Sequence, residues 1–288
     1  MASAKKHDYH IIDPSPWPLI ASVGAFIGAI GAIVWMRSDG AANLAGLSLP
    51  AWFIFAIGLG IVLYVMYGWW SDTVKESHEG HHTPVVSLHL RYGMIMFIAS
   101  EVMFFAAWFW AFFDASIFYG EAQQVERLTY TGGQWPPTGT EVLDPLHLPL
   151  YNTIILLLSG TTVTWAHHGL LHNDRTALNW GLGLTVALGI LFSFVQIYEY
   201  SVAPFSFSNS LYGATFFMAT GFHGFHVFIG VVFLAVCLIR SLRGDFTRDK
   251  HFGFEAAAWY WHFVDVVWLF LFFAIYVWGG WGAPIYAH

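Results

Sequence analysis

The sequence contains few charged residues and a single cysteine. Asp, Glu, Lys and Arg make up 10% of its 288 residues, whereas a typical globular chain has about 25%. So few charges cannot cover the surface of a soluble domain, and they argue against nucleic-acid binding, which needs clustered basic residues. Cys237 is the one cysteine, which excludes an intramolecular disulfide and a cysteine-based metal cluster.

Apolar residues are abundant instead. Hydrophobic residues make up 57% of the chain, aromatic residues make up 19%, and the mean hydropathy is +0.57. A bilayer core about 30 Å thick is crossed by roughly 20 apolar residues in a helix. The sequence therefore predicts an all-α polytopic membrane protein, one membrane domain over residues 1–288. Its seven transmembrane helices are expected at about 17–36, 50–70, 90–113, 148–171, 178–198, 212–240 and 256–278.

The basic residues are distributed unevenly between the two sides of this predicted bundle. Nine of the eleven lie in the N-terminal tail or near the loops after the second, fourth and sixth helices: Lys5, Lys6, Lys75, Arg91, Arg175, Arg240, Arg243, Arg248 and Lys250. Arg37 and Arg127 lie on the other side. Because cytoplasmic loops carry the excess of Lys and Arg, the N-terminus is expected in the cytoplasm or matrix and the C-terminus outside.

Two loops stand out by length and composition. The segment from Asp114 to Pro149 is rich in Gly and Pro and is expected to form an ordered, turn-rich cap on the outer side. The segment from Ser71 to His89 is polar and carries four histidines. No internal repeat is visible, so an inverted-repeat transporter is not supported.

Glu101 lies in the middle of an apolar run, between Ser100 and Val102. An ionisable group inside a bilayer is costly and needs a partner or a function. Two interpretations remain open. The acid can be a proton relay or polar anchor in an internal cleft, or a protonated glutamic acid hydrogen-bonded to a neighbouring helix, because desolvation alone favours its neutral form.

Several histidines also lie inside the predicted helices. His223 and His226 are three residues apart and share a helix face. Imidazole and carboxylate groups suit iron, copper or zinc, and His167, His168, Glu255, His262 and Asp265 could be joined into such a site. Because no third shared signature accompanies these pairs, hydrogen bonding between helices is the favoured interpretation, and we predict no metal site.

Long motifs in a fixed order resemble a known family. They are Leu90–Met94, Ser100–Val102, Thr164–His168, Phe217–His226 and Gly253–Trp268, together with the loop motif Gly133–Gly139. These segments resemble subunit III of cytochrome c oxidase, and the similarity runs from about Asp13 to Trp278. Seven helices fit the aa3-type subunit, whereas the quinol-oxidase relatives with five helices lack the first pair.

The resemblance implies a fold and a role. Helices one and two, within 17–70, are expected to splay from helices three to seven, within 90–278, and to leave a V-shaped cleft filled with phospholipid. The implied protein is a non-catalytic core subunit of a proton-translocating oxidase in aerobic electron transport. It is expected to bind subunit I directly, to have subunit II and other oxidase subunits as further partners, to hold structural phospholipid, and to support proton uptake and enzyme stability. It carries no cofactor itself, since haem a, haem a3 and the copper centres lie in the partner subunits.

The resemblance also suggests functional residues. Glu101 falls on the family's buried glutamate facing the cleft. The positions expected to border phospholipid headgroups are Arg91, Arg240, Glu76, His81, His82, His226 and Glu255. Arginine near the interface can bind phosphate through two hydrogen bonds, and basic pockets on the inner side suit anionic lipids. No catalytic residue is expected in this chain.

The chain departs from the family pattern at several places. Ser71 and Lys75 stand where the family often has Arg, Asp114 stands where it often has His or a small polar residue, and one residue is deleted between Glu76 and His81. A bacterial inner membrane is the expected location, with the mitochondrial inner membrane as the alternative. A self-contained proton-conducting or metal-binding membrane protein, using Glu101 and the histidines, remains the alternative function.

Overall fold

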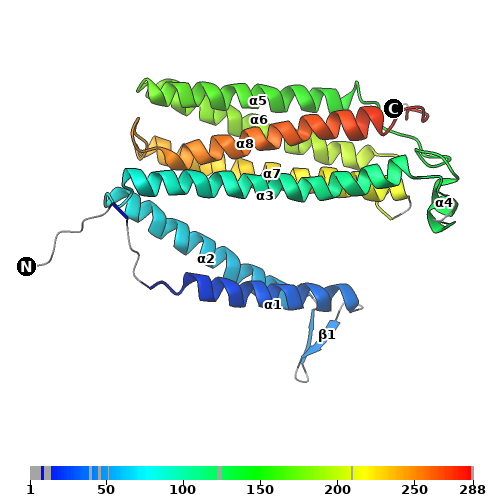
Figure 1. Cartoon of the computed structure of the whole chain (residues 1–288), viewed down its shortest axis with the longest axis horizontal. Coiled ribbons are helices and arrows are strands. Elements are labelled where there is room, and N and C mark those ends of the chain that lie inside the picture. The colour runs from blue at the N-terminus through cyan, green and yellow to red at the C-terminus, as the bar shows by residue number, and fades with distance from the viewer. Residues whose placement is uncertain are drawn as a thin grey trace, which may run out of the picture. The chain divides into compact units, whose positions relative to one another are not determined.

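Figure 1 presents a computed structural model that describes residues 8–9, 14–38, 41–44, 47–50, 52–121, 125–208 and 210–286. Lys5 and Lys6, which contribute to the charge asymmetry, lie outside these residues. Within the described ranges, seven helices are long and apolar enough to cross a bilayer. This number and the helical class confirm the prediction. The chain divides into two compact units, Met1–Leu90 and Arg91–His288, and the lipid-filled cleft stays a prediction.

The smaller unit is a helical hairpin. Its two long helices are α1 (Trp17–Arg37) and α2 (Trp52–His78), and a short antiparallel ribbon of β1 (Ala41–Leu44) and β2 (Leu47–Pro50) connects them. This ribbon was not predicted. At the other end of the hairpin, the indole Nε1 of Trp17 donates to Asp72 Oδ2 at 2.7 Å, so the first turn of α1 is tied to the polar end of α2.

Glycine lets α1 and α2 approach closely. A Cβ atom placed on Gly31 would collide with the backbone of Phe55, and one placed on Gly58 would collide with the backbone of Gly28. Small residues serve in this way where helices associate in a membrane. Gly31 and Gly58 therefore mark the contact between the first and second spans.

The polar segment after the second span is a correction to the prediction. The sequence assigned residues 71–89 to a loop, but α2 continues to His78 and α3 (Pro84–Ile117) begins at Pro84. Hydropathy marks only the part of a helix that lies in hydrocarbon, and Ser, Lys and Glu continue a helix into water without a signal. Glu76 is accordingly a residue of α2 and not of a loop.

The larger unit contains the remaining helices, shown in green to red in Figure 1. They are α4 (Val125–Thr131), α5 (Leu148–Leu171), α6 (Arg175–Val202), α7 (Leu211–Leu242) and α8 (Phe252–Leu271), which a π-helical segment η1 (Phe272–Trp278) extends. The third, fifth, sixth and seventh spans are each longer than predicted, and α4 was not predicted. Helices α5, α6, α7 and α8 form a ring in which α5 also contacts α8.

Local sequence sets the ends of these helices. Asp174 precedes α6 and accepts hydrogen bonds from the backbone N–H groups of Thr176 and Ala177, both at 3.0 Å. Ser210 precedes α7 and accepts from Gly213 N at 2.8 Å. Side-chain oxygens at these positions satisfy donors that a helix N-terminus leaves open, so the short α5–α6 connection fixes the register of both helices.

The core of the larger unit lies around α8. Trp261 and Trp268 are buried, and their indole N–H groups donate to Ser159 Oγ and Thr153 Oγ1 on α5, both at 2.9 Å. The apolar rings therefore pack between helices while their polar atoms remain satisfied. In the predicted turn-rich cap, Trp135 donates from Nε1 to the carbonyl oxygen of Gly279 at 3.0 Å, which ties this part of the loop to the end of η1.

A glycine pair on α6 gives a direct test of helix packing. A Cβ on Gly181 would lie 2.9 Å from Ala166 N and Thr162 O of α5, whereas a Cβ on Gly183 would meet nothing within 4 Å. We predict that Gly181→Leu lowers the free energy of unfolding by about 1–3 kcal/mol, because it overpacks the α5–α6 contact. Gly183→Leu is the matched control. Thermal unfolding in detergent measures both, and equal midpoints for the two variants would contradict the packing.

Candidate functional site

Glu101 on α3 and His226 on α7 form a pair inside the larger unit. Glu101 Oε2 lies 2.8 Å from His226 Nε2, and the side chains are 21% and 9% exposed. The rings of Phe105 and Tyr260 flank the imidazole, with centroids 4.8 Å and 6.4 Å away. Glu101 thus contacts a neighbouring helix through His226, a partner that the sequence did not predict, and its role stays a prediction.

The other ring nitrogen of His226 determines how many protons the pair holds. His226 Nδ1 lies 2.6 Å from the carbonyl oxygen of Phe222, and a carbonyl oxygen can only accept, so Nδ1 carries a hydrogen. The bond between Nε2 and Glu101 then contains one further proton. That proton lies either on a neutral carboxylic acid or on an imidazolium that faces a carboxylate. In both forms the pair has no net charge.

Arg91 and Glu255 form a second pair, between α3 and the first turn of α8. Arg91 Nε lies 3.0 Å from Glu255 Oε2, and Nη2 lies 2.8 Å from the same oxygen. The side chains are 40% and 15% exposed. The N-terminus of α8 also stabilises the Glu255 carboxylate, because a helix N-terminus carries partial positive charge. Two of the predicted headgroup residues are thus partners of each other.

Arg240 lies near the end of α7 and close to the same turn of α8. Its Nε donates to Asp245 Oδ2 at 3.3 Å, and its guanidinium stands 4.7 Å from the ring centroid of Phe246. A Cβ placed on Gly253 would lie 3.1 Å from Arg240 Nη1. The guanidinium groups of Arg91 and Arg240 therefore both lie near the first turn of α8.

The remaining predicted residues belong to the smaller unit. Glu76, on α2, accepts a hydrogen bond on its backbone oxygen from His81 N at 3.0 Å. His81 Nε2 lies 3.5 Å from Glu79 Oε2. His82 follows in the short connection to α3. These residues lie together at the end of α2.

Two further intramembrane histidines, His223 and His262, are bonded to other helices. His223 Nε2 lies 3.1 Å from the carbonyl oxygen of Val264, and His262 Nε2 lies 3.2 Å from Thr164 Oγ1. His262 Nδ1 is also 3.6 Å from Asp265 Oδ2. Hydrogen bonding between helices, the favoured interpretation, is confirmed for these residues. Within the described part of the chain, no three His, Cys, Asp or Glu residues are placed to hold a metal ion.

A buried polar cluster near the end of α6 was not predicted. Glu199 is fully buried, and its Oε1 accepts from Tyr276 Oη at 2.6 Å and from Gln196 Nε2 at 3.1 Å. Gln196 Oε1 accepts in turn from Asn152 Nδ2 on α5 at 3.2 Å. The spacing of Gln196 and Glu199, three residues apart on one helix, is the signal that could have identified the cluster.

The fold and these pairs define a multi-pass helical membrane protein whose intramembrane polar side chains bond largely to one another. The model of the family "Cytochrome c oxidase subunit III" matches residues 7–280. The chain belongs to this family.

Full-length relatives carry the same name. The chain is 53% identical over 282 residues to cytochrome c oxidase subunit 3 of Arabidopsis thaliana, covering 97% of this chain and 100% of the relative. It is 52% identical over 282 residues to that of Marchantia polymorpha, with the same coverage. It is 51% identical over 274 residues to that of Gadus morhua, covering 95% of this chain and 98% of the relative.

The Glu101–His226 bond can be tested with two substitutions. Glu101→Gln keeps a donor for His226 Nε2 and is expected to change stability little. Glu101→Leu leaves that nitrogen unpaired in an apolar setting and should lower the free energy of unfolding by about 1–3 kcal/mol. Met103→Leu, at an exposed position of the same helix, is the control. Thermal unfolding of the purified protein is the measurement, and equal losses for the Gln and Leu variants would rule out the bond.

Proposed function

We propose that this chain is the non-catalytic subunit III of a cytochrome c oxidase that works in aerobic electron transport. The observation that carries the proposal is the full-length match, 53% identity over 97% of this chain and 100% of the relative from Arabidopsis thaliana. Because the match covers both chains almost from end to end, we infer that this chain and the relative share one fold. The chain acts as part of a proton-translocating enzyme and is not itself the catalyst.

Subunit I is the proposed direct partner, with subunit II and further oxidase subunits in the same complex. Haem a, haem a3 and the copper centres are assigned to those partners. The chemistry of this chain supports the assignment, since His226 uses one ring nitrogen for Phe222 and the other for Glu101. An imidazole with both nitrogens engaged has none left to ligate a metal.

Phospholipid is the proposed ligand at the first turn of α8. The guanidinium groups of Arg91 and Arg240 lie near this turn, and a helix N-terminus adds partial positive charge that suits a phosphate. Glu255 holds Arg91 in an ion pair at 2.8 Å, and Asp245 holds Arg240 at 3.3 Å, so the less tightly paired Arg240 is the stronger phosphate ligand. In the smaller unit, Glu76, His81 and His82 are proposed to contact headgroups at the end of α2.

Depth separates His226 and Glu101 from these headgroup contacts. Glu101 follows Arg91 by ten residues on α3, which corresponds to about 15 Å along the helix. That distance is about one leaflet of hydrocarbon. We therefore propose that the Glu101–His226 pair lies at the level of acyl chains and supports proton uptake by the complex without touching a phosphate.

An energy-transducing inner membrane is the proposed location. Seven spans and the bias of basic residues favour an N-terminus on the cytoplasmic side and a C-terminus on the periplasmic side of a bacterial inner membrane. The mitochondrial inner membrane is the alternative, and there the N-terminus would face the matrix.

Purification from native membranes tests the proposed function. We expect a tagged chain in mild detergent to bring with it larger subunits and the reduced-minus-oxidised spectrum of haem a. The isolated chain, stripped from the complex, should show no haem. A chain that purifies alone and conducts protons or retains a metal would instead establish the self-contained membrane protein.

Lipid content tests the site at α8. Arg240→Ala should lower the phospholipid retained by the purified complex, because it removes a cation beside the helix N-terminus. Arg240→Lys should retain part of it, since Lys keeps the charge but loses the planar fork. Arg248→Ala, at an exposed position beyond α7, is the control. Quantitative mass spectrometry of extracted lipid is the measurement, and unchanged content in Arg240→Ala would refute the site.

A further inference from the structure

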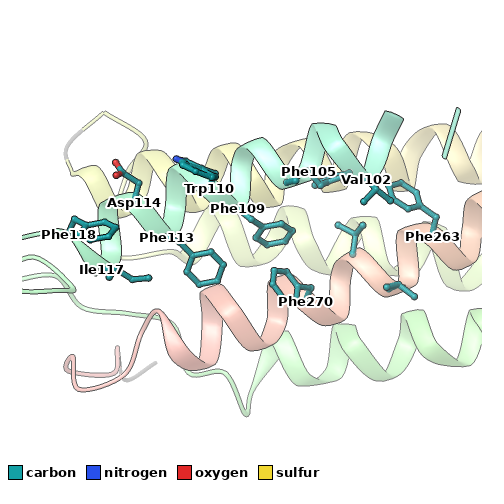
Figure 2. Close-up of a pocket in the computed structure, with 13 residues that line it drawn as sticks. Val102, Phe105, Phe109, Trp110, Phe113, Asp114, Ile117, Phe118, Phe263 and Phe270 are labelled. Carbon is teal, nitrogen blue, oxygen red and sulfur yellow. The ribbon is translucent and has the colours of Figure 1, made fainter. Parts of the chain in front are cut away.

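A long groove runs between α3 and α8 in the larger unit, with a volume of about 660 Å³. Figure 2 shows its lining side chains, which come from both helices and are almost all apolar. The helices meet here through aromatic rings, since Phe109 packs edge-on against Phe270 with centroids 4.4 Å apart. Rings of this size hold the two backbones apart, and the space between them becomes the groove.

The groove has a closed floor and an open rim. Phe105, Phe109 and Val267 are 2%, 9% and 8% exposed and form the floor. Val266 and Trp110 line the groove at 65% and 77% exposure. An apolar concavity of this kind, open along one side, suits a slender apolar ligand that lies in it lengthwise.

The length of the groove fits an acyl chain. Its lining residues run from Val102 on α3 to Phe118, the residue that follows the end of α3, a span of about 24 Å at the rise of a helix. This exceeds the roughly 15 Å of one hydrocarbon leaflet, so the groove covers an acyl chain and reaches the headgroup level. A transmembrane helix of the same length occupies about 1,900 Å³ as a cylinder 10 Å wide, so only a strip of its side chains would enter.

One end of the groove is polar. Asp114 lines the groove there, and its side chain is 39% exposed. Arg127 from α4 donates to both the carboxylate and the backbone oxygen of Asp114. Trp110 stands one turn earlier on α3 (Figure 2), and an indole at this level can donate to an ester or phosphate oxygen.

Charge complementarity at this end selects a zwitterionic headgroup. A carboxylate and a guanidinium side by side present both signs of charge, as do the ammonium and phosphate of an amine-bearing phospholipid. We propose that the α3–α8 groove binds a single phospholipid with an amine headgroup. One acyl chain lies along the phenylalanine floor, the ammonium donates to Asp114, and the phosphate lies beside Arg127.

This site is separate from the phosphate site proposed at the first turn of α8. It is built on Asp114, one of the positions at which the chain departs from the family pattern. The inference rests on the chemistry of the groove and does not depend on the role in an oxidase. The haem spectrum of each preparation reports that role independently.

Lipid retention tests the groove. The complex is purified in mild detergent after exchange into membranes of phosphatidylethanolamine and phosphatidylglycerol, and bound lipid is counted by native mass spectrometry. Val266→Trp fills the groove from an exposed position and should remove a single phosphatidylethanolamine. Val236→Trp makes the same change at an exposed position of α7 and should remove none. Equal retention in the two variants would overturn the proposal.

A second substitution, at Asp114, tests the proposed amine headgroup. Asp114→Asn leaves the groove open but removes the carboxylate, and should weaken retention of phosphatidylethanolamine by about tenfold, the worth of one charge-assisted hydrogen bond. Retention of phosphatidylglycerol should not fall. Equal loss of both lipids would overturn the assignment, and a density map with a polypeptide helix in the groove would replace the lipid by a protein partner.

Discussion

The absence of water inside a bilayer is the constraint on which this structure depends. A polar side chain in hydrocarbon has no solvent to bond, so it must find its partner within the protein. Glu101 hydrogen-bonds to His226, Glu199 accepts from Tyr276, and the buried indoles of α8 donate to hydroxyl groups of α5. Each of these bonds joins two different elements. The polar groups therefore specify which faces of the helices meet, while apolar contacts alone would permit many arrangements.

Two kinds of residue set the spacing between helices. Glycine lets α1 approach α2 and lets α5 approach α6 until backbone meets backbone. Phenylalanine does the opposite between α3 and α8, where tilted and edge-on rings lie in the contact between the two helices. The same unit thus contains a tightly packed ring of helices and, against it, a helix held off by aromatic side chains. A groove forms between α3 and α8 because the aromatic rings do not fill the full depth of the space between the two helices.

Hydropathy in the sequence was sufficient for the number of spans, because burial in lipid requires long apolar runs. It failed at helix ends, since residues 71–78 of α2 are polar and helical at once. It also missed the ribbon of β1 and β2, which lies outside the spans. Each strand has only four residues, too few for the alternation of apolar and polar residues to identify it.

The sequence singled out Glu101, His226, Arg91 and Glu255, but not the pairs that these residues form. The position of Glu101 in an apolar run required a partner, yet nothing in the sequence distinguished His226 from the other intramembrane histidines. Arg91 was expected to face lipid, and the structure gives it Glu255 as well. Glu199 was missed because it lies between two tyrosines near the end of a span. An acidic residue at that position is readily taken for one that faces water. Partners distant in sequence become visible only in three dimensions.

The shared proton of Glu101 and His226 also determines how this pair responds to voltage. A full charge crossing the membrane exchanges about 2.3 kcal/mol with each 100 mV of potential. The pair is neutral in both of its forms, and its proton can move by no more than the 2.8 Å between the two atoms. That is less than about a tenth of a 30 Å hydrocarbon core, so the field shifts the balance by at most about 0.2 kcal/mol per 100 mV. A fully energised membrane therefore leaves the balance of this acid and base almost unchanged.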